Sequence, residues 1–309
     1  MSVGRSLKDS GVAITGALGN LGTKLARHLA SRGFRKLIGL DLREDPEWVE
    51  SVRLAGNEAG HTDLVVDTRV CDLANPEDDD WRSVIKEVGG VVHFAADNPY
   101  PEATWREAAR SIDMTINTAM AASDARACTR YVFATSNHVM GRHRTAGLEA
   151  GELKPDTPEG VGTVWDTGDR SMDSTPYASA KFAGERVCRG LGSKQNGTDF
   201  VAIRIGWCQP GRNERSTLSA AGTPTQGRGE DAQDADLEAT DRWFKGMWLS
   251  NTDMVHLFER ALLAPATDWE DGYVLVNGMS NNTRMVWSLD ETRAKLGYEP
   301  VDDVYSEQS

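Results

Sequence analysis

Tyr177 and Lys181 stand four residues apart in the segment Tyr-Ala-Ser-Ala-Lys, residues 177–181. Residues four apart on a helix share one face, so the lysine ammonium can lie beside the phenol and favour its ionised form. A tyrosine with a pKa near ~10 is a poor base at neutral pH until a neighbouring cation lowers that pKa. Ser136, in Ala-Thr-Ser-Asn-His at 134–138, adds a hydroxyl that can donate to a substrate oxygen. The three side chains therefore predict that Tyr177 removes a proton from a substrate hydroxyl as general base.

A glycine-rich turn precedes these residues, with the sequence Thr-Gly-Ala-Leu-Gly-Asn-Leu-Gly at 15–22. It follows a predicted strand at Val12–Ile14 and opens a predicted helix at Asn20–Ser31. Gly16 permits a tight turn, Gly19 lets the backbone approach a pyrophosphate, and Gly22 lets the helix pack on the strand. The helix N-terminus adds free N–H groups and a positive dipole end. A dinucleotide site is therefore predicted at Gly16, Gly19, Asn20, Leu21 and Gly22.

Asp41 ends the predicted second strand, Lys36–Asp41. A carboxylate there can accept hydrogen bonds from the ribose hydroxyls of the adenosine and repels a 2′-phosphate, so NAD is favoured over NADP. Arg43 follows two residues later and can soften this preference by turning toward a phosphate. With NAD as cofactor, the substrate carbon would pass its hydride to the nicotinamide, and Lys181 can also hold the nicotinamide ribose.

The elements that must position these residues alternate along the first two thirds of the chain. Further strands are predicted at Leu64–Val70, Val91–Ala95, Tyr131–Thr135 and Val201–Ile205, and helices at about Pro76–Val88, Pro101–Ala127 and Thr175–Leu191. Strands that alternate with helices favour a parallel sheet covered on both faces. The predicted fold class is α/β, a doubly wound parallel sheet of the dinucleotide-binding (Rossmann) kind.

The pattern becomes irregular after Gly206. Residues 219–241 are poor in large apolar side chains, which predicts a mobile surface insertion, with a lid over the substrate as the alternative. Beyond it we expect a helix at Met254–Leu263, a strand at Tyr273–Val276 and a helix at Leu289–Leu296. We therefore expect an NAD-binding domain, residues 1–205, with the three catalytic side chains, and a small substrate-binding lobe, residues 206–309.

The chain has 309 residues, a formal net charge of −13 and a pI of about 5.0. This acidic balance, with no run rich in Lys and Arg, argues against nucleic acid as a partner. The four cysteines form no Cys-x-x-Cys pair, so we expect reduced thiols and no metal site. No apolar stretch approaches the ~20 residues of a membrane span, and the polar N-terminus lacks the apolar core of a signal peptide. The expected compartment is the cytoplasm.

Together these residues resemble the extended branch of the short-chain dehydrogenase/reductases, the NAD-dependent epimerase/dehydratase family. The likeness rests on the Thr-Gly-x-x-Gly-x-x-Gly spacing, on the Tyr-x-x-x-Lys pair and on the serine segment 136–141. It covers the chain from about Val12 onward, apart from 219–241. The resemblance implies that Asp72 and Leu73 border the adenine and that the backbone at Ala95 passes the ribose. By analogy it also suggests a homodimer.

Within this branch, the segments 135–138, 177–185 and 204–210 resemble bacterial uronate dehydrogenases. That resemblance implies oxidation of the anomeric hydroxyl of a sugar acid or anionic hexose to a lactone, with NAD. It implies that Ser136, Asn137 and His138 contact the sugar. An arginine that binds the substrate carboxylate in that family is matched, with a small shift, by Arg215 or Arg212.

The chain also departs from that pattern. Trp207 stands where the family has a small serine, and it can reshape the pocket for a different anionic sugar, such as a phosphorylated or sulfonated hexose. The basic run 142–144 is a second candidate partner for an anion. Asp113 stands where the extended branch usually has asparagine.

Two other functions stay open. A nucleotide-sugar epimerase or dehydratase of the same branch usually needs a larger C-terminal lobe. A dehydratase would also want an Asp-Glu pair beside the serine, where Asn137 and His138 stand. A non-catalytic, NAD-sensing regulator tends to lose the tyrosine or the lysine, and this chain keeps both.

Overall fold

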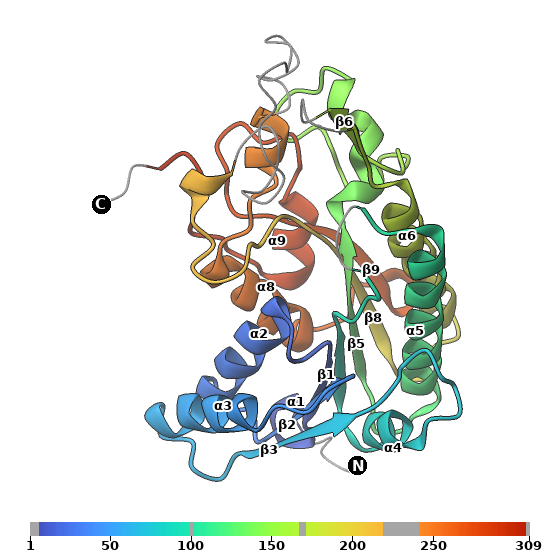
Figure 1. Ribbon diagram of the computed structural model, residues 1–309, viewed down its shortest axis with the longest axis vertical. Helices are drawn as coiled ribbons and strands as arrows, with labels where there is room; N and C mark the ends of the chain where they lie inside the picture. Colours follow the sequence, from blue (N-terminus) through green and yellow to red (C-terminus); the bar gives the residue numbers. More distant parts are fainter. Residues whose placement is uncertain (1–5, 99–101, 167–170, 219–240, 307–309) are drawn as a thin grey trace.

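The computed structural model describes residues 6–98, 102–166, 171–218 and 241–306, so the predicted insertion lies outside it except for Asp241. A sheet of seven parallel strands runs through the centre in the order β3-β2-β1-β4-β5-β8-β9 (Figure 1). The strands are β1 (Val12–Thr15), β2 (Lys36–Asp41), β3 (Val65–Val70), β4 (Gly90–His93), β5 (Arg130–Ser136), β8 (Asp199–Ile205) and β9 (Tyr273–Gly278). Every predicted strand is present with slightly shifted ends, and the doubly wound α/β fold is confirmed.

Helices cover both faces of this sheet (Figure 1). One face carries α2 (Asn20–Ser31), α3 (Pro46–Glu58), α8 (Asn251–Leu263) and α9 (Asp290–Leu296), and the other carries α4 (Asp79–Glu87), α5 (Trp105–Asp124) and α6 (Thr175–Gly192). A short α1 (Leu7–Ser10) precedes β1. The helix α3 was not predicted, although Asp45 caps its first turn by accepting from the backbone N–H of Glu47 and Trp48.

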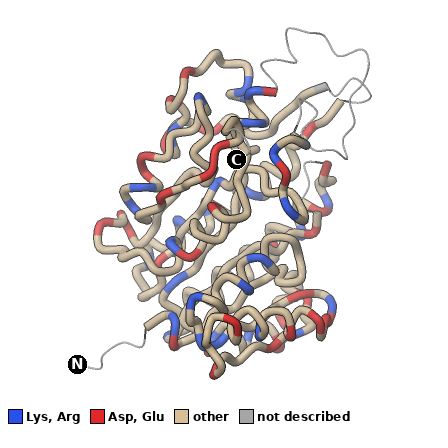
Figure 2. The backbone as a smooth tube through the Cα atoms, turned by 90° about the vertical axis from the view of Figure 1, so that its left-hand side faces the viewer, with Lys and Arg blue, Asp and Glu red and all other residues tan. Residues whose placement is uncertain are grey.

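Basic and acidic residues are interspersed along the described backbone (Figure 2). Among the described residues, no helix combines the length and the apolar character needed to cross a bilayer. The four cysteines are unpaired thiols, as expected, and three of them are buried: Cys71, Cys128 and Cys188.

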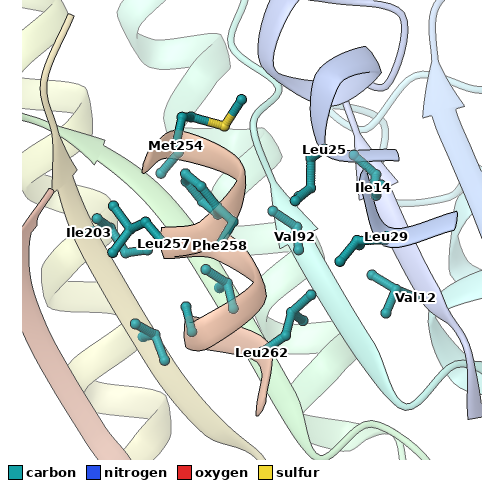
Figure 3. Close-up of a cluster of buried hydrophobic side chains, with 14 of the residues drawn as sticks. Val12, Ile14, Leu25, Leu29, Val92, Ile203, Met254, Leu257, Phe258 and Leu262 are labelled. Carbon is teal, nitrogen blue, oxygen red and sulfur yellow. The ribbon is translucent and has the colours of Figure 1, made fainter. Parts of the chain in front are cut away.

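The larger core cluster contains residues from Val12 of β1 to Tyr298, and Figure 3 shows part of it. On α8, the apolar residues Leu257, Phe258 and Leu262 lie between Ile203 of β8 and Val92 of β4. Each fully buried side chain of this size contributes about 1.5–3 kcal/mol by its removal from water. The expected domain boundary at residue 205 coincides with the end of β8. Beyond this boundary, β9 is a strand of the same sheet, and α8 contributes to the core cluster that packs on it.

Irregular structure follows the carboxyl end of β5. The 3-10 segment η1 (Asn137–Thr145) continues directly from Ser136, and an antiparallel pair, β6 (Val164–Asp166) and β7 (Ser171–Asp173), leads into α6. A separate aromatic cluster, which includes Trp165, Phe244 and Trp287, packs beside this region. The β6–β7 pair was not predicted, and it lies just before the helix that carries Tyr177.

Candidate active site

The carboxyl ends of six neighbouring strands border a cavity of about 360 Å³. Parallel strands end at one edge of the sheet, so residues that follow different strands meet there. The predicted site residues that line it are Gly16, Gly19, Asn20, Leu21, Gly22, Asp41, Leu73, Ala95, Ser136, Asn137, His138, Tyr177, Lys181 and Trp207. Within the part of the chain that the structure describes, no group of acidic, His and Cys side chains could hold a metal ion.

The three predicted catalytic residues come from two elements. Ser136 is the last residue of β5, and its Oγ accepts a hydrogen bond from the backbone N–H of His138 at 3.1 Å. Tyr177 and Lys181 lie on successive turns of α6. The Lys181 Nζ donates to the carbonyl oxygen of Ala134 at 2.8 Å and lies 5.8 Å from the centroid of the Tyr177 ring. This arrangement places an ammonium beside the phenol, as the spacing in the sequence predicts.

Burial acts on both titratable groups of this pair. It raises the pKa of Tyr177 to about 12, and a hydrogen bond with Ser136 acts in the opposite direction. It lowers the pKa of Lys181 to about 8, so the ammonium is still charged at neutral pH. The Lys181 ammonium lies 5.8 Å from the centroid of the Tyr177 ring, and its attraction for a phenolate acts against this effect of burial on the pKa of Tyr177.

These pKa shifts predict how turnover depends on pH. With Tyr177 as the predicted general base, kcat/KM is expected to rise from neutral pH to about pH 8, and to level off as Lys181 loses its proton. Burial lowers the pKa of His138 to about 4, so this residue adds no inflection near neutrality. The check is a kcat/KM profile at constant ionic strength. A fall in kcat/KM between neutral pH and pH 8 would contradict the assignment of the base.

The substrate end of the cavity is polar on one side and aromatic on the other. The Asn137 amide nitrogen donates to the carbonyl oxygen of Ile205 at 2.9 Å, whereas its buried Oδ1 has no partner among the described residues. The neutral His138 ring makes an edge-on contact with Trp207, with the ring centroids 6.4 Å apart. Trp207 in turn packs on Phe244 at a centroid distance of 4.9 Å. A ligand here would meet one free acceptor, one imidazole and an indole surface.

The cofactor end is built around the turn between β1 and α2. Gly16 has a φ of +63°, which favours glycine, and a Cβ on Gly22 would collide with the backbone at Ala17. At the end of β2, the Asp41 carboxylate accepts from the backbone N–H of Leu18 at 3.1 Å and of Leu42 at 2.9 Å. The turn is therefore close enough to β2 for one ligand to touch both.

The backbone after β4 is fixed by Thr15. Its hydroxyl accepts from the N–H of Phe94 and of Ala95, each at 3.2 Å, and contacts Nδ1 of His93 at 2.8 Å. Burial lowers the pKa of His93 to about 3, so this residue is a neutral core histidine. Ala95 follows directly and lines the cavity.

Two predicted contact residues have their charged groups bound by other parts of the chain. The Asp72 carboxylate accepts from Arg110 Nη2 at 3.0 and 2.9 Å, and its neighbours Cys71 and Leu73 line the cavity together with Arg110. The Arg215 guanidinium donates to the carbonyl oxygen of Asp303 and to Ser306, and Arg215 does not line the cavity. The alternative, Arg212, is exposed and pairs with Glu214 at 3.0 Å. In the basic run, His143 and Arg144 border a second cavity.

The sequence analysis missed other residues on α5. Arg110 and Met114 line the cavity, and Asn117 donates to the carbonyl oxygen of Leu73 at 2.9 Å. Asp113, read in the place of the family asparagine, is exposed on the same helix. Asn117 lies one turn further on, and a search of the whole helix for an amide facing the sheet would have found it.

Asp41 supplies a test of cofactor selectivity. Asp41→Ala is expected to lower the ratio of kcat/KM with NAD to kcat/KM with NADP by about tenfold, or ~1.4 kcal/mol, because it removes the carboxylate that repels a 2′-phosphate. The measurement compares both cofactors at one substrate concentration. Arg43→Ala is the matched comparison, since Arg43 borders the same end of the cavity: it is expected to leave NAD use nearly unchanged and to weaken NADP use, which moves the ratio in the opposite direction. An unaltered ratio in Asp41→Ala would place the ribose contact elsewhere.

Comparison with known proteins agrees with this geometry. The chain is 28% identical to an NAD-dependent glucose-6-phosphate dehydrogenase of Haloferax volcanii, over 96% of this chain and 94% of that protein. It is 27% identical to an L-arabinose 1-dehydrogenase (NAD(P)(+)) of the same organism, over 94% and 96%. A uronate dehydrogenase of Pseudomonas syringae pv. tomato is 24% identical, over 94% and 81%.

Solved structures share the fold at lower identity. A UDP-glucuronic acid 4-epimerase from Bacillus cereus, in complex with UDP-glucuronic acid and NAD, superposes with a TM-score of 0.62 at 14% identity, over 95% of each chain. The family model described as "NAD dependent epimerase/dehydratase family" matches residues 12–208, which span the glycine turn, Ser136, Tyr177 and Lys181. The cofactor is NAD, and the chain belongs to the NAD-dependent epimerase/dehydratase family, the extended short-chain dehydrogenase/reductases.

Proposed function

We propose that this protein oxidises the anomeric hydroxyl of a sugar acid or anionic hexose to a lactone, with NAD as the hydride acceptor. The observation that carries the proposal is the convergence of Ser136, Tyr177 and Lys181 on the cavity that the glycine turn also borders. The three sugar dehydrogenases that match nearly the whole chain support a free sugar as the substrate.

In this reaction Tyr177 acts as the general base. Its phenolate takes the proton of the anomeric hydroxyl, while the Ser136 hydroxyl donates to the same oxygen as it becomes a carbonyl. Lys181, held by the carbonyl oxygen of Ala134, stabilises the phenolate. NAD, when bound, supplies the nicotinamide that accepts the hydride from the anomeric carbon. A cyclic hemiacetal suits this site, because loss of that hydride gives a lactone without ring opening.

The substrate end supports a sugar in a second way. The unpartnered Oδ1 of Asn137 can accept from a sugar hydroxyl, and the indole of Trp207 offers an apolar surface to the C–H face of a ring. The preference for an anionic sugar rests on two of the relatives, whose names specify glucose 6-phosphate and a uronate. Arg215 does not support an anionic substrate, because its guanidinium donates a hydrogen bond to the hydroxyl of Ser306.

The direct experiment is NAD reduction by the purified protein with a panel of sugars. The panel contains galacturonate, glucuronate, glucose 6-phosphate, 6-sulfonated glucose, L-arabinose, glucose and UDP-glucose. Reduction of NAD with a uronate or with an anionic hexose is the expected result. Conversion of UDP-glucose to an epimer, without net NAD reduction by any free sugar, would replace this proposal by a nucleotide-sugar epimerase.

A further inference from the structure

The imidazole of His138 is held from behind by two buried hydroxyls. Its Nδ1 lies 2.7 Å from Oγ1 of Thr163 and 3.2 Å from Oγ of Ser174. Thr163 and Ser174 are both fully buried, and neither borders the catalytic cavity, whereas His138 does. Thr163 directly precedes β6 and Ser174 directly follows β7, so the two ends of this strand pair meet behind the imidazole.

The hydrogen atoms of this cluster can be assigned one by one. Ser174 Oγ accepts from the backbone N–H of Thr163 at 2.8 Å, and its own proton can go to the Thr163 carbonyl oxygen at 3.2 Å. Within the described residues, the only partner of the Thr163 hydroxyl is Nδ1 of His138. If Nδ1 carried a proton, the Thr163 hydroxyl would be left as a buried donor without an acceptor, which is unfavourable. The arrangement that satisfies every donor has Thr163 donating to an unprotonated Nδ1.

We propose that Thr163 is a positioning residue that holds His138 in the tautomer protonated on Nε2, so that the imidazole presents a hydrogen-bond donor to the sugar. Ser174 fixes Thr163 in turn, because its hydroxyl bonds both the backbone N–H and the carbonyl oxygen of Thr163. Within the described part of the chain, Nε2 has no protein partner, and the ring reaches the cavity between Tyr177 and Trp207. Because burial keeps the ring neutral, it carries a single N–H, and the contacts of Nδ1 decide which of the two nitrogens bears that proton. The inference builds on the proposed function, since it names the group that meets the sugar.

The donor on His138 complements the acceptor beside it. Oδ1 of Asn137 is unpartnered, and its orientation is fixed because Nδ2 donates to the carbonyl oxygen of Ile205. A sugar that places a hydroxyl proton toward Oδ1 and an oxygen lone pair toward Nε2 satisfies both groups. In the tautomer protonated on Nδ1, both Oδ1 of Asn137 and Nε2 of His138 would be acceptors. The same substrate would then lose one of its two hydrogen bonds.

Gly141 contributes to the contact between Thr163 and the imidazole of His138. A Cβ at this position would collide with the Thr163 hydroxyl, so the glycine allows Thr163 to reach the imidazole. Gly141 is the last residue of the serine segment, and the sequence alone does not explain why a glycine stands at this position. The structure supplies one, because the segment that bears Asn137 and His138 must pass close to the strand pair behind it.

Imidazole-15N NMR on the ligand-free protein tests the tautomer without any substrate. The chain has 6 histidines, and the spectrum of His138→Gln assigns the His138 signals by their disappearance. At neutral pH we expect a pyrrole-type Nε2 and a pyridine-type Nδ1. A protonated Nδ1 in the wild-type protein would overturn the proposal, whether or not the protein oxidises a sugar.

Variants at Thr163 separate positioning from packing. Thr163→Val removes the hydroxyl at nearly constant volume, and we expect Nδ1 to become partly protonated and the sugar KM to rise about tenfold, with the KM for NAD within about twofold. Thr163→Ser keeps the hydroxyl and is expected to restore both the NMR pattern and the sugar KM. An unchanged tautomer in Thr163→Val, or a Thr163→Ser variant that behaves like Thr163→Val, would contradict the role of the hydroxyl.

Discussion

Tyr177→Phe is expected to lower kcat for NAD reduction by about two to four orders of magnitude while leaving NAD affinity nearly unchanged. The change deletes one oxygen, and with it the group that accepts the substrate proton. The phenyl ring keeps the contact with His138, and Lys181 keeps its hydrogen bond to the carbonyl oxygen of Ala134. The loss should therefore appear in the chemical step and not in the binding of the cofactor.

Steady-state kinetics and calorimetric titration with NAD separate these two effects. Tyr131→Phe is the matched control, because it deletes the same atom from a buried tyrosine that contacts Thr118 and does not border the cavity. That control is expected to lose some stability and to keep kcat. Wild-type turnover in Tyr177→Phe would show that another group accepts the proton.

Arg204→Met is expected to lower the free energy of unfolding by about 3–5 kcal/mol, because it leaves a carboxylate buried without its counter-ion. Arg204 on β8 is fully buried and binds Glu185 on α6 through Nε at 3.0 Å and Nη2 at 2.8 Å. Glu185 also accepts from the hydroxyl of Thr135 at 2.8 Å. The pair lies one turn beyond Lys181 and next to Ser136, so it fixes the helix against the strand that carries the serine.

Urea unfolding of the single and double variants measures this contribution. Arg204→Met combined with Glu185→Leu is expected to recover most of the loss, since the buried charge is then absent. Arg69→Met is the control, because Arg69 pairs with Asp67 on the half-exposed edge strand β3 and should cost only ~0–1 kcal/mol. If Arg204→Met costs no more than Arg69→Met, the pair does not hold α6 in place.

Local sequence patterns were sufficient to predict the sheet and its catalytic edge. The strands are short apolar runs, and the carboxyl ends of parallel strands meet at one edge, so the joint location of Asp41 and Ser136 followed from their order. The helix α3 was missed because only three of its residues are buried, Trp48, Val52 and Gly56, which leaves a weak apolar stripe.

Contacts between distant segments could not be predicted in this way. Arg110, 38 residues away, binds the carboxylate of Asp72, which was expected to border the adenine. Arg215 was expected to bind the substrate, but the segment near Ser306 engages it. The hydroxyls behind His138 come from positions 25 and 36 residues later in the chain. Only the folded chain shows that the β6–β7 pair brings them there.

In the proposed reaction the hydride leaves the anomeric carbon of a free sugar, and a deuterium label on that carbon follows it. The protein would be incubated with NAD and with glucuronate or glucose 6-phosphate that carries deuterium on the anomeric carbon, and the reduced cofactor would be analysed by mass spectrometry. We predict that the deuterium moves to the nicotinamide and that the sugar becomes a lactone or its hydrolysis product. Reduced cofactor without deuterium, or sugar that retains its label while NAD is reduced, would contradict oxidation at that carbon.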